Sequence, residues 1–336
     1  MRRVFSHPAG RLEKVIVNGE RQLQNKLGDP TSREVWIYVP AQYDATNPPP
    51  LLIDLAAYTS SGPAHLSWQG FRENLPERLD RLMGEGMLPA VVAIPDAFTS
   101  LGGNQYVNSP ILGHWQDFLK EALVPEVESA FPCGGQGRRG LFGHSSGGYG
   151  ALYNAIKDPV TWSAVGCLAG DMAFELVYLA DMPKVANHLA RYEGSIEVFM
   201  AAFKASHKPT GFDIPTLMTI AMAASYDPQE GVPYGAVLPV DLHTLELDPT
   251  RWQRWLRFDP LHMAKDFSDN LKALKCLIIE CGCQDEYHLH YGARRLTKRL
   301  TALGVPHHYE EFPDGHSGLD YRLDTILPRL SQALWK

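Results

Sequence analysis

The serine at the centre of residues 143–147 is the residue best placed to do chemistry. The run reads Gly143-His144-Ser145-Ser146-Gly147 and fits the pattern G-x-S-x-G. In this pattern the serine sits on a sharp, strained turn between a strand and a helix, which requires small residues on both sides. Such a turn would expose the Ser145 hydroxyl as a nucleophile. It would also aim the backbone N–H of Ser146, at a helix N-terminus, at a developing oxyanion.

A serine nucleophile needs a base that removes its proton and an acid that orients this base. In hydrolases that carry this turn, the acid and then the histidine follow the serine along the chain. His316 fits this order, because it lies in the glycine-flanked loop Gly315-His316-Ser317-Gly318 after the last predicted strand. We therefore expect His316 to be the base and not merely an exposed loop histidine.

Two aspartates compete for the role of the acid. Asp285 follows the predicted strand 274–280, and its loop leaves the carboxyl end of that strand. This is the same edge of the sheet as the strained turn at residues 143–147, the nucleophile elbow. Asp171, at the end of the preceding predicted strand, is the alternative. Glu286 and Asp314 are weaker candidates, because each adjoins a better-placed group. We favour Asp285.

The second oxyanion donor should come from the loop after the predicted strand 51–55. This loop begins Ala56-Ala57-Tyr58 and is small at first, as a close backbone approach requires. We expect the Tyr58 N–H to be the donor and the Tyr58 ring to flank the acyl group. Ala57, Tyr58 and Trp68 are the expected substrate contacts, in a pocket that is largely apolar.

Strands and helices that alternate along the chain must position these residues. Such alternation is typical of βαβ units and predicts an α/β protein with a mostly parallel sheet flanked by helices. Apolar or β-rich runs predict strands at 33–40, 51–55, 90–94, 140–142, 163–169, 274–280 and 308–312. Apolar residues at helical spacing predict helices at 68–84, 115–131, 149–156 and 290–303.

The alternation stops for about ninety residues after Gly170. Segment 171–260 is rich in Met, Ala, Phe and Pro, contains no convincing parallel strand, and looks helical in pieces such as 214–225. It is too apolar to be disordered, and long insertions of this kind usually have a function. We expect a core made of residues 1–170 and 261–336, and a largely helical cap made of residues 171–260.

Composition and charge limit the class of protein. Apolar residues make up 45% of the 336 residues and charged residues 21%, as in soluble globular proteins. The net charge of −7 disfavours nucleic acid or an anionic membrane as a partner. No stretch is long and apolar enough to span a membrane, and residues 1–8 lack the apolar part of a secretory signal. We expect a cytoplasmic protein. The sequence does not decide whether it forms a homo-oligomer.

The five cysteines predict neither a disulfide framework nor a metal site. Their number is odd and their density is low, which fits a reducing compartment. Cys281 and Cys283, with His288 and His290 shortly after them, could suggest a metal. A C-x-C pair, however, lacks the C-x₂-C spacing of zinc sites, and no second pair follows. We expect buried thiols at a strand end, with no metal and no cofactor.

The elbow and the residues upstream of it are similar to those of a known family. They resemble the esterase D-like, or putative esterase, branch of the α/β hydrolases, which includes S-formylglutathione hydrolases, feruloyl esterases, enterochelin esterases and antigen 85 mycolyltransferases. The resemblance covers roughly residues 34–170 and 270–320. It rests on Pro95-Asp96, Tyr106-Val107-Asn108-Ser109-Pro110, Gly113-His114-Trp115, Phe118-Leu119, Leu123-Val124-Pro125 and Gly143-His144-Ser145-Ser146-Gly147-Gly148-Tyr149-Gly150-Ala151-Leu152.

The resemblance implies an α/β-hydrolase fold and a serine carboxylesterase that works through an acyl-enzyme. It places the nucleophile on Ser145, the acid on Asp285 and the base on His316. Acyl transfer or thioester hydrolysis would use the same residues, and a third hypothesis is a hydrolase fold retained as a binding module. The chain departs from the family where Ala56-Ala57 replaces a His-Gly or Asp-Gly pair, and in the length of segment 171–260.

Overall fold

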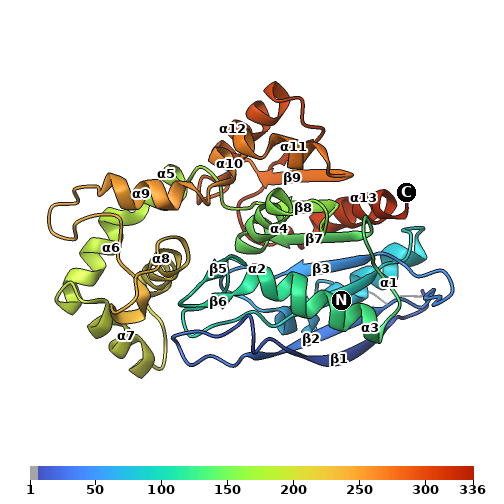
Figure 1. Ribbon diagram of the computed structural model, residues 1–336, viewed down its shortest axis with the longest axis horizontal. Coiled ribbons are helices and arrows are strands. Elements are labelled where there is room, and N and C mark those ends of the chain that lie inside the picture. The colour runs from blue at the N-terminus through green and yellow to red at the C-terminus, as the bar shows by residue number, and fades with distance from the viewer. Residues whose placement is uncertain (1–6) are drawn as a thin grey trace.

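An eight-stranded sheet forms the centre of the computed structural model, which describes residues 7–336 (Figure 1). The strand order is β1-β2-β4-β3-β7-β8-β9-β10. β2 is antiparallel to both of its neighbours, and all the other neighbouring strands are parallel. The predicted mostly parallel sheet is thus confirmed. Residues 1–6, which belong to the stretch in which no secretory signal was predicted, lie outside the described residues.

The bounds of the elements are as follows. The strands are β1 (Arg11–Asn18), β2 (Ser32–Val39), β3 (Leu51–Leu55), β4 (Val91–Pro95), β7 (Arg139–His144), β8 (Ala164–Leu168), β9 (Cys276–Gly282) and β10 (His308–Phe312), with a separate hairpin of β5 (Asn108–Ser109) and β6 (Gly113–His114). The α-helices are α1 (Leu75–Gly84), α2 (Trp115–Asp117), α3 (Val124–Ala130), α4 (Ser146–Lys157), α5 (Phe174–Val177), α6 (Met182–Leu189), α7 (Ile196–Ala205), α8 (Asp213–Tyr226), α9 (Pro249–Leu256), α10 (Pro260–Asp266), α11 (Ser268–Lys272), α12 (Leu289–Ala302) and α13 (Leu323–Trp335). A π-helix spans Phe118–Leu123, and 3₁₀ turns span Gly62–Leu66, Leu179–Asp181, Ala190–Tyr192, Pro233–Gly235 and Leu319–Arg322.

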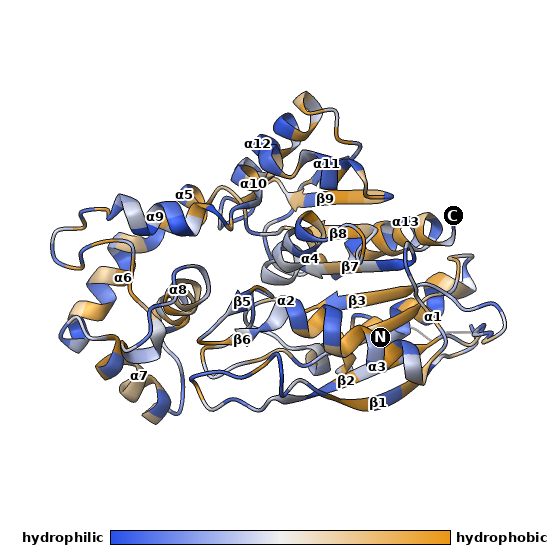
Figure 2. Ribbon diagram, viewed as in Figure 1, coloured by the Kyte–Doolittle hydropathy of each residue, from blue (hydrophilic) through white to orange (hydrophobic). Residues whose placement is uncertain are grey.

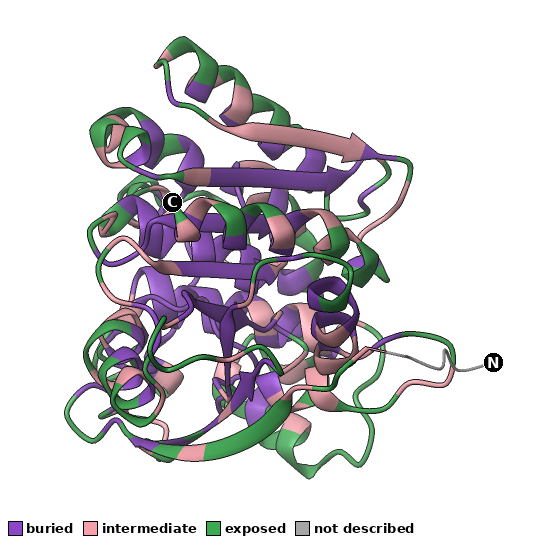
Figure 3. Cartoon of the chain, turned by 90° about the vertical axis from the view of Figure 1, so that its right-hand side faces the viewer, coloured by how far each residue is buried: buried purple, intermediate pink, exposed green. Residues whose placement is uncertain are grey.

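The central strands are apolar because helices cover the sheet. Every residue of β3, β4 and β8 is buried, as expected for parallel strands between helical layers. α4 packs on β3, β7 and β8, and α13 packs on β7, β8 and β9. Apolar residues follow the strands in Figure 2, and Figure 3 shows the buried centre of the sheet beside its exposed edge strand β1. No helix in residues 7–336 is long and apolar enough to cross a membrane.

Segment 171–260 contains helices and contributes no strand to the sheet. α5 to α9 lie within it, and within the described residues its one strand-like contact is an isolated bridge between Val240 and Leu247. The segment begins where β8 ends, and most of it lies to one side of the sheet (Figure 1). The predicted helix at 214–225 is confirmed as α8. Aromatic contacts join the segment to α4: the Tyr149 ring makes a tilted contact with Phe174 and an edge contact with Tyr226.

The prediction of a helix over 68–84 is wrong for its first seven residues. α1 begins at Leu75, because Asn74 caps it: the Asn74 side chain accepts from the Glu77 N–H at 2.9 Å, and the Glu77 carboxylate accepts from the Asn74 N–H. Pro76, which is favoured only in the first turn of a helix, marks the same boundary. Trp68 therefore lies in a loop, with 61% of its surface exposed.

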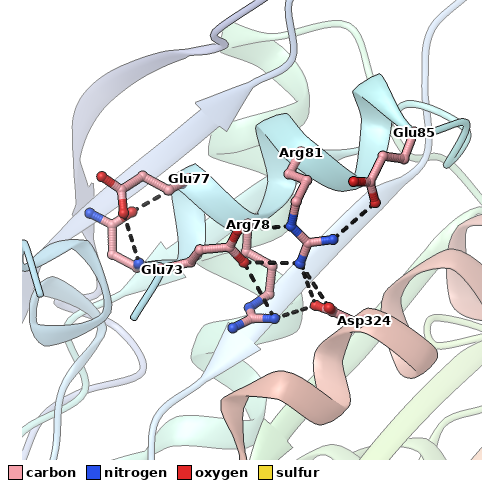
Figure 4. A network of polar contacts seen from close by, with 7 residues as sticks. Glu73, Glu77, Arg78, Arg81, Glu85 and Asp324 are labelled. Atoms are coloured by element: carbon pink, nitrogen blue, oxygen red, sulfur yellow. Dashed lines mark hydrogen bonds and ion pairs between the residues drawn. The ribbon is translucent and has the colours of Figure 1, made fainter. Parts of the chain in front are cut away.

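A buried ion-pair network fixes α1 to α13 (Figure 4). Arg81 donates to both carboxylate oxygens of Asp324 at 2.8 Å and, through Nε, to Glu73 at 2.8 Å. Arg78 pairs with the same two acids. The two arginines are almost fully buried, so the acids must neutralise them. The network secures the helix that follows the loop carrying His316.

Candidate active site

Ser145 occupies a strained turn between β7 and α4. Its φ of 56° is positive, which is costly for a residue with a side chain and is typical of functional sites. A Cβ on Gly147 would lie 1.7 Å from the carbonyl oxygen of Leu55, and one on Gly143 would lie 2.4 Å from the same oxygen. Neither position can therefore hold a side chain, so the two glycines let β3 approach the turn.

The structure brings Ser145, His316 and Asp285 together. The His316 Nε2 lies 3.0 Å from the Ser145 Oγ, and the His316 Nδ1 lies 2.7 Å from the Asp285 Oδ2. Asp285 is 2% exposed, and its Oδ1 accepts from the backbone N–H of Tyr287 at 2.9 Å. The backbone N–H of His316 donates to the Glu286 carboxylate at 2.8 Å. These contacts hold the imidazole in one orientation between the hydroxyl and the carboxylate.

Two rings pack against the His316 imidazole. The centroid of the His144 ring lies 4.6 Å away, and Tyr287 makes an edge contact at 4.7 Å. Burial, together with the proximity of His316, lowers the pKa of His144 to about 4. His144 is thus neutral at physiological pH. Apart from the place of His144 next to Ser145, no sequence pattern indicates this contact.

The two backbone N–H groups predicted to form the oxyanion hole make no hydrogen bond within residues 7–336. They belong to Ser146, the first residue of α4, and to Tyr58, in the loop after β3. The Tyr58 side chain does not lie where we expected it. Its ring is 4% exposed, and its hydroxyl donates to the Leu101 carbonyl at 2.5 Å. The prediction that this ring flanks the acyl group is therefore wrong, whereas its backbone N–H stays available.

A cavity of about 100 Å³ lies beside the elbow. Ala57 lines it, but Tyr58 and Trp68 do not, and Trp68 lies in the exposed loop before α1. Much of the lining is polar and includes Asp54 and His65. Ser145, Asp285 and His316 do not line this cavity, so the apolar substrate pocket and its contacts stay a prediction. The Asp54 carboxylate contacts the His65 Nδ1 and raises the pKa of His65 to about 9.

Asp171, the alternative acid, has other partners. Its carboxylate accepts from the Tyr178 hydroxyl at 2.7 Å and forms a side-chain hydrogen bond with Gln105. Burial raises the pKa of Asp171 to about 6, and the hydrogen bond from Tyr178 opposes this shift. The Nδ1 of His316 is hydrogen-bonded to Asp285, so Asp285, and not Asp171, occupies the position expected of the acid.

Within the described residues, the cysteines and the nearby histidines do not form a cluster that could hold a metal ion. Cys281 is buried, and burial raises the pKa of its thiol, while all five cysteines are free. Within residues 7–336, two groups of side chains come close enough to share an ion, and neither contains a cysteine. In one, Asp259 caps α10; in the other, Arg322 already pairs with Glu280 and Glu310. Both groups therefore have structural partners.

The comparison with protein families decides the family. The model described as "Putative esterase" matches residues 29–327, which is most of the chain. The chain belongs to the putative esterase family. Members of this family are described as esterases, so the assignment agrees with a serine at a hydrolase elbow. A search of the curated proteins finds no match.

Solved structures similar to this esterase-family chain share its fold. A ferulic acid esterase aligns with a TM-score of 0.60 at 15% identity, covering 97% of this chain and 99% of that one. The fluorophosphonate-binding serine hydrolase F of Staphylococcus aureus aligns with a TM-score of 0.59 at 14% identity, covering 98% and 100%. An S-formylglutathione hydrolase from Agrobacterium tumefaciens aligns with a TM-score of 0.57 at 16% identity, covering 97% and 96%. The fold is that of the α/β hydrolases, as the sequence predicted.

Proposed function

We propose that this esterase-family protein hydrolyses carboxylic esters through an acyl-enzyme on Ser145. The observation that carries the proposal is the hydrogen-bonded row of Ser145, His316 and Asp285 at a strained elbow. A nucleophile within reach of a base, which a third group orients, is the arrangement that nucleophilic catalysis by serine requires.

The proton moves along this row during each half of the reaction. The Ser145 Oγ attacks the ester carbonyl while the His316 Nε2 takes the hydroxyl proton, and the Asp285 carboxylate stabilises the imidazolium at Nδ1. The N–H groups of Ser146 and Tyr58 donate to the oxyanion, and each such donor contributes roughly a hundredfold to a thousandfold in rate. The tetrahedral intermediate collapses when the alkoxide leaves with the proton from Nε2. Water then attacks the acyl group in the same way and frees Ser145.

We also propose that segment 171–260 acts as a cap over residues 1–170 and 261–336. Its position at the end of β8, close to the elbow helix α4, supports this role. The expected partner is a small-molecule ester, without metal or cofactor, because none of the proposed steps needs one. The net charge of −7 and the free thiols support a cytoplasmic protein that binds neither nucleic acid nor membranes.

The experiment is a panel of p-nitrophenyl esters of increasing chain length, extended with aryl esters and thioesters. Wild-type protein should turn over carboxylic esters and react with a fluorophosphonate probe. Ser145→Ala should lose both properties while keeping its thermal transition, and Ser60→Ala, in the loop after β3, should keep both. Substantial ester turnover by Ser145→Ala would refute the proposal. If the protein turns over thioesters faster than esters, thioester hydrolysis becomes the proposed function. If it transfers the acyl group to an added alcohol, acyl transfer does.

A further inference from the structure

The segment Leu101–Tyr106 contacts both residues, Tyr58 and Ser146, whose backbone N–H groups are the predicted oxyanion donors. On one side it holds Tyr58 at two points. The Gly103 N–H donates to the Tyr58 carbonyl at 2.7 Å, and the Tyr58 hydroxyl donates to the Leu101 carbonyl at 2.5 Å. Two hydrogen bonds thus hold Tyr58: one fixes the peptide plane between Tyr58 and Thr59, and the other fixes the end of the side chain.

The contact between Gly103 and Tyr58 is too close for any side chain. A Cβ on Gly103 would lie 2.2 Å from the Tyr58 carbonyl oxygen and 2.4 Å from the Tyr58 Cα. These are backbone atoms, so the clash could be relieved only by moving the loop after β3. Gly102 has a φ of +93°, and its Cβ would lie 2.7 Å from the Tyr58 hydroxyl. The two glycines therefore let the segment reach Tyr58.

On its other side the segment holds Ser146. The Gln105 Nε2 donates to the Ser146 Oγ at 2.7 Å, and both residues are almost fully buried. The next residue, Tyr106, donates through its hydroxyl to the Ala56 carbonyl at 2.9 Å, so the start of the loop after β3 is held as well. Ala56 and Ala57 carry no polar side chain, and their loop needs partners of this kind to be ordered.

The segment is itself rigid, so it can position its neighbours. Thr99 and Gly102 exchange two backbone hydrogen bonds, of 2.7 and 3.0 Å, which close the turn before it. The Asn154 side chain donates from α4 to the Tyr106 carbonyl at 2.9 Å. Tyr106 has a φ of 56°, a strained conformation that persists because its neighbours fix it.

We propose that Leu101–Tyr106 is a brace that positions both donors of the oxyanion hole, with Gly103 and Gln105 as its positioning residues. The two donors lie on separate elements, the loop after β3 and the start of α4. A pair of donors stabilises an oxyanion only if both are held within about 0.5 Å of their productive places. The brace is the segment that contacts both donor residues, and it does so through Gly103, Leu101 and Gln105. This inference rests on the proposed ester hydrolysis.

The test compares four variants of the brace and its partners with a matched control from the same turn. Gly103→Ala displaces Tyr58, and Tyr58→Phe removes the bond to Leu101. Gln105→Met removes the bond to Ser146 at a similar volume, but also the contact with Asp171; Ser146→Ala removes the same bond and leaves the Asp171 contact in place. We expect kcat to fall roughly a hundredfold for Gly103→Ala and roughly tenfold for the other three, with KM changed less than about threefold. Ser100→Ala, which loses only a surface contact with Asp29, should keep the wild-type kcat.

A second readout separates positioning from a general loss of structure. A trifluoromethyl ketone forms a tetrahedral alkoxide on the serine, so its inhibition constant should rise in proportion to the loss of kcat/KM. If Gly103→Ala does not fold, Tyr58→Phe and Gln105→Met decide. Wild-type kcat and inhibition in folded brace variants would overturn the brace while leaving ester hydrolysis intact. An inactive wild type, or an active Ser145→Ala, would instead overturn the proposed function and the brace with it.

Discussion

The ring of His144 packs against the ring of His316, with the centroids 4.6 Å apart and the planes 38° apart. The residue that precedes the nucleophile in sequence thus contacts the group proposed as its base. Since the pKa of His144 is lowered to about 4, its ring stays neutral while His316 gains and loses a proton. A neutral neighbour supports the imidazole without repelling the imidazolium.

This lowered pKa makes His144 a source of instability in acid. As the pH falls from about 6.5 to 4, the unfolded chain binds a proton at His144 before the folded protein does, and unfolding becomes easier. The difference from the ordinary value corresponds to about 3 kcal/mol. His144→Phe keeps an aromatic contact but has no proton to bind. Urea unfolding at pH 7.5 and pH 5 should show the variant gaining stability relative to wild type at the lower pH; an equal difference at both pH values would contradict this.

Three carboxylates near His316 should differ sharply in their effect on turnover. Asp285→Asn should lower kcat roughly ten-thousandfold, because the amide favours the wrong tautomer of the imidazole. Glu286→Gln can still accept the backbone N–H of His316, and Asp171 is hydrogen-bonded to Tyr178 instead, so Glu286→Gln and Asp171→Asn should stay within about tenfold of wild type. Steady-state kinetics on one ester measures all three. A larger loss for Asp171→Asn than for Asp285→Asn would reverse the assignment of the acid.

Gly147→Ala should destabilise the fold as well as the site. Its Cβ would lie 1.7 Å from the Leu55 carbonyl oxygen, which is backbone, so β3 and α4 would have to separate. We expect the free energy of unfolding to fall by about 3 kcal/mol or more. The matched control is Gly70→Ala, whose Cβ would meet only the end of the Trp68 ring at 3.4 Å. Chemical denaturation of both variants checks this, and equal stabilities would show that the turn can relax.

The His65–Asp54 pair should stabilise the protein at neutral pH and fail at alkaline pH. Asp54 raises the pKa of His65 to about 9, so the stabilisation is complete below about 6.5 and is lost as the pH rises through 9. Because the His65 side chain is 32% exposed and therefore partly screened, we expect about 2 kcal/mol rather than the full shift. His65→Gln should be less stable than wild type at pH 6 and equal to it at pH 10. A difference that does not change with pH would contradict the ion pair.

The sequence predicted the residues of the candidate site better than their surroundings. The elbow pattern, the chain order and the loops after two strands were enough to predict that Ser145, Asp285 and His316 would meet, and the structure brings them together. Their catalytic roles stay a prediction. The Tyr58 ring was misplaced because its partner, the Leu101 carbonyl, belongs to a segment without periodicity. Contacts of this kind depend on the fold and leave no local pattern.

The fold, too, was predicted well in some elements and poorly in others. Buried strands such as β3 and β4 are continuous apolar runs, so they could be predicted from composition. β1 was not predicted, because most of its residues are exposed and it pairs along one side only. The start of α1 was placed too early, because the aromatic residue Trp68 continued the helical spacing past the Asn74 cap. Here the capping chemistry outweighed the apolar pattern.

Asp285 and His316 follow β9 and β10, the last two strands at one edge of the sheet, whereas Ser145 follows a strand near its middle. β10 has one neighbour, and most of its residues are only half-buried. Strands of this kind open locally at a lower free energy than the central strands of a sheet. Brief detachment of β10 would withdraw the base from a nucleophile whose own strand stays paired. Ester turnover would then disappear at denaturant concentrations that leave the rest of the protein folded, so activity reports on the integrity of this edge.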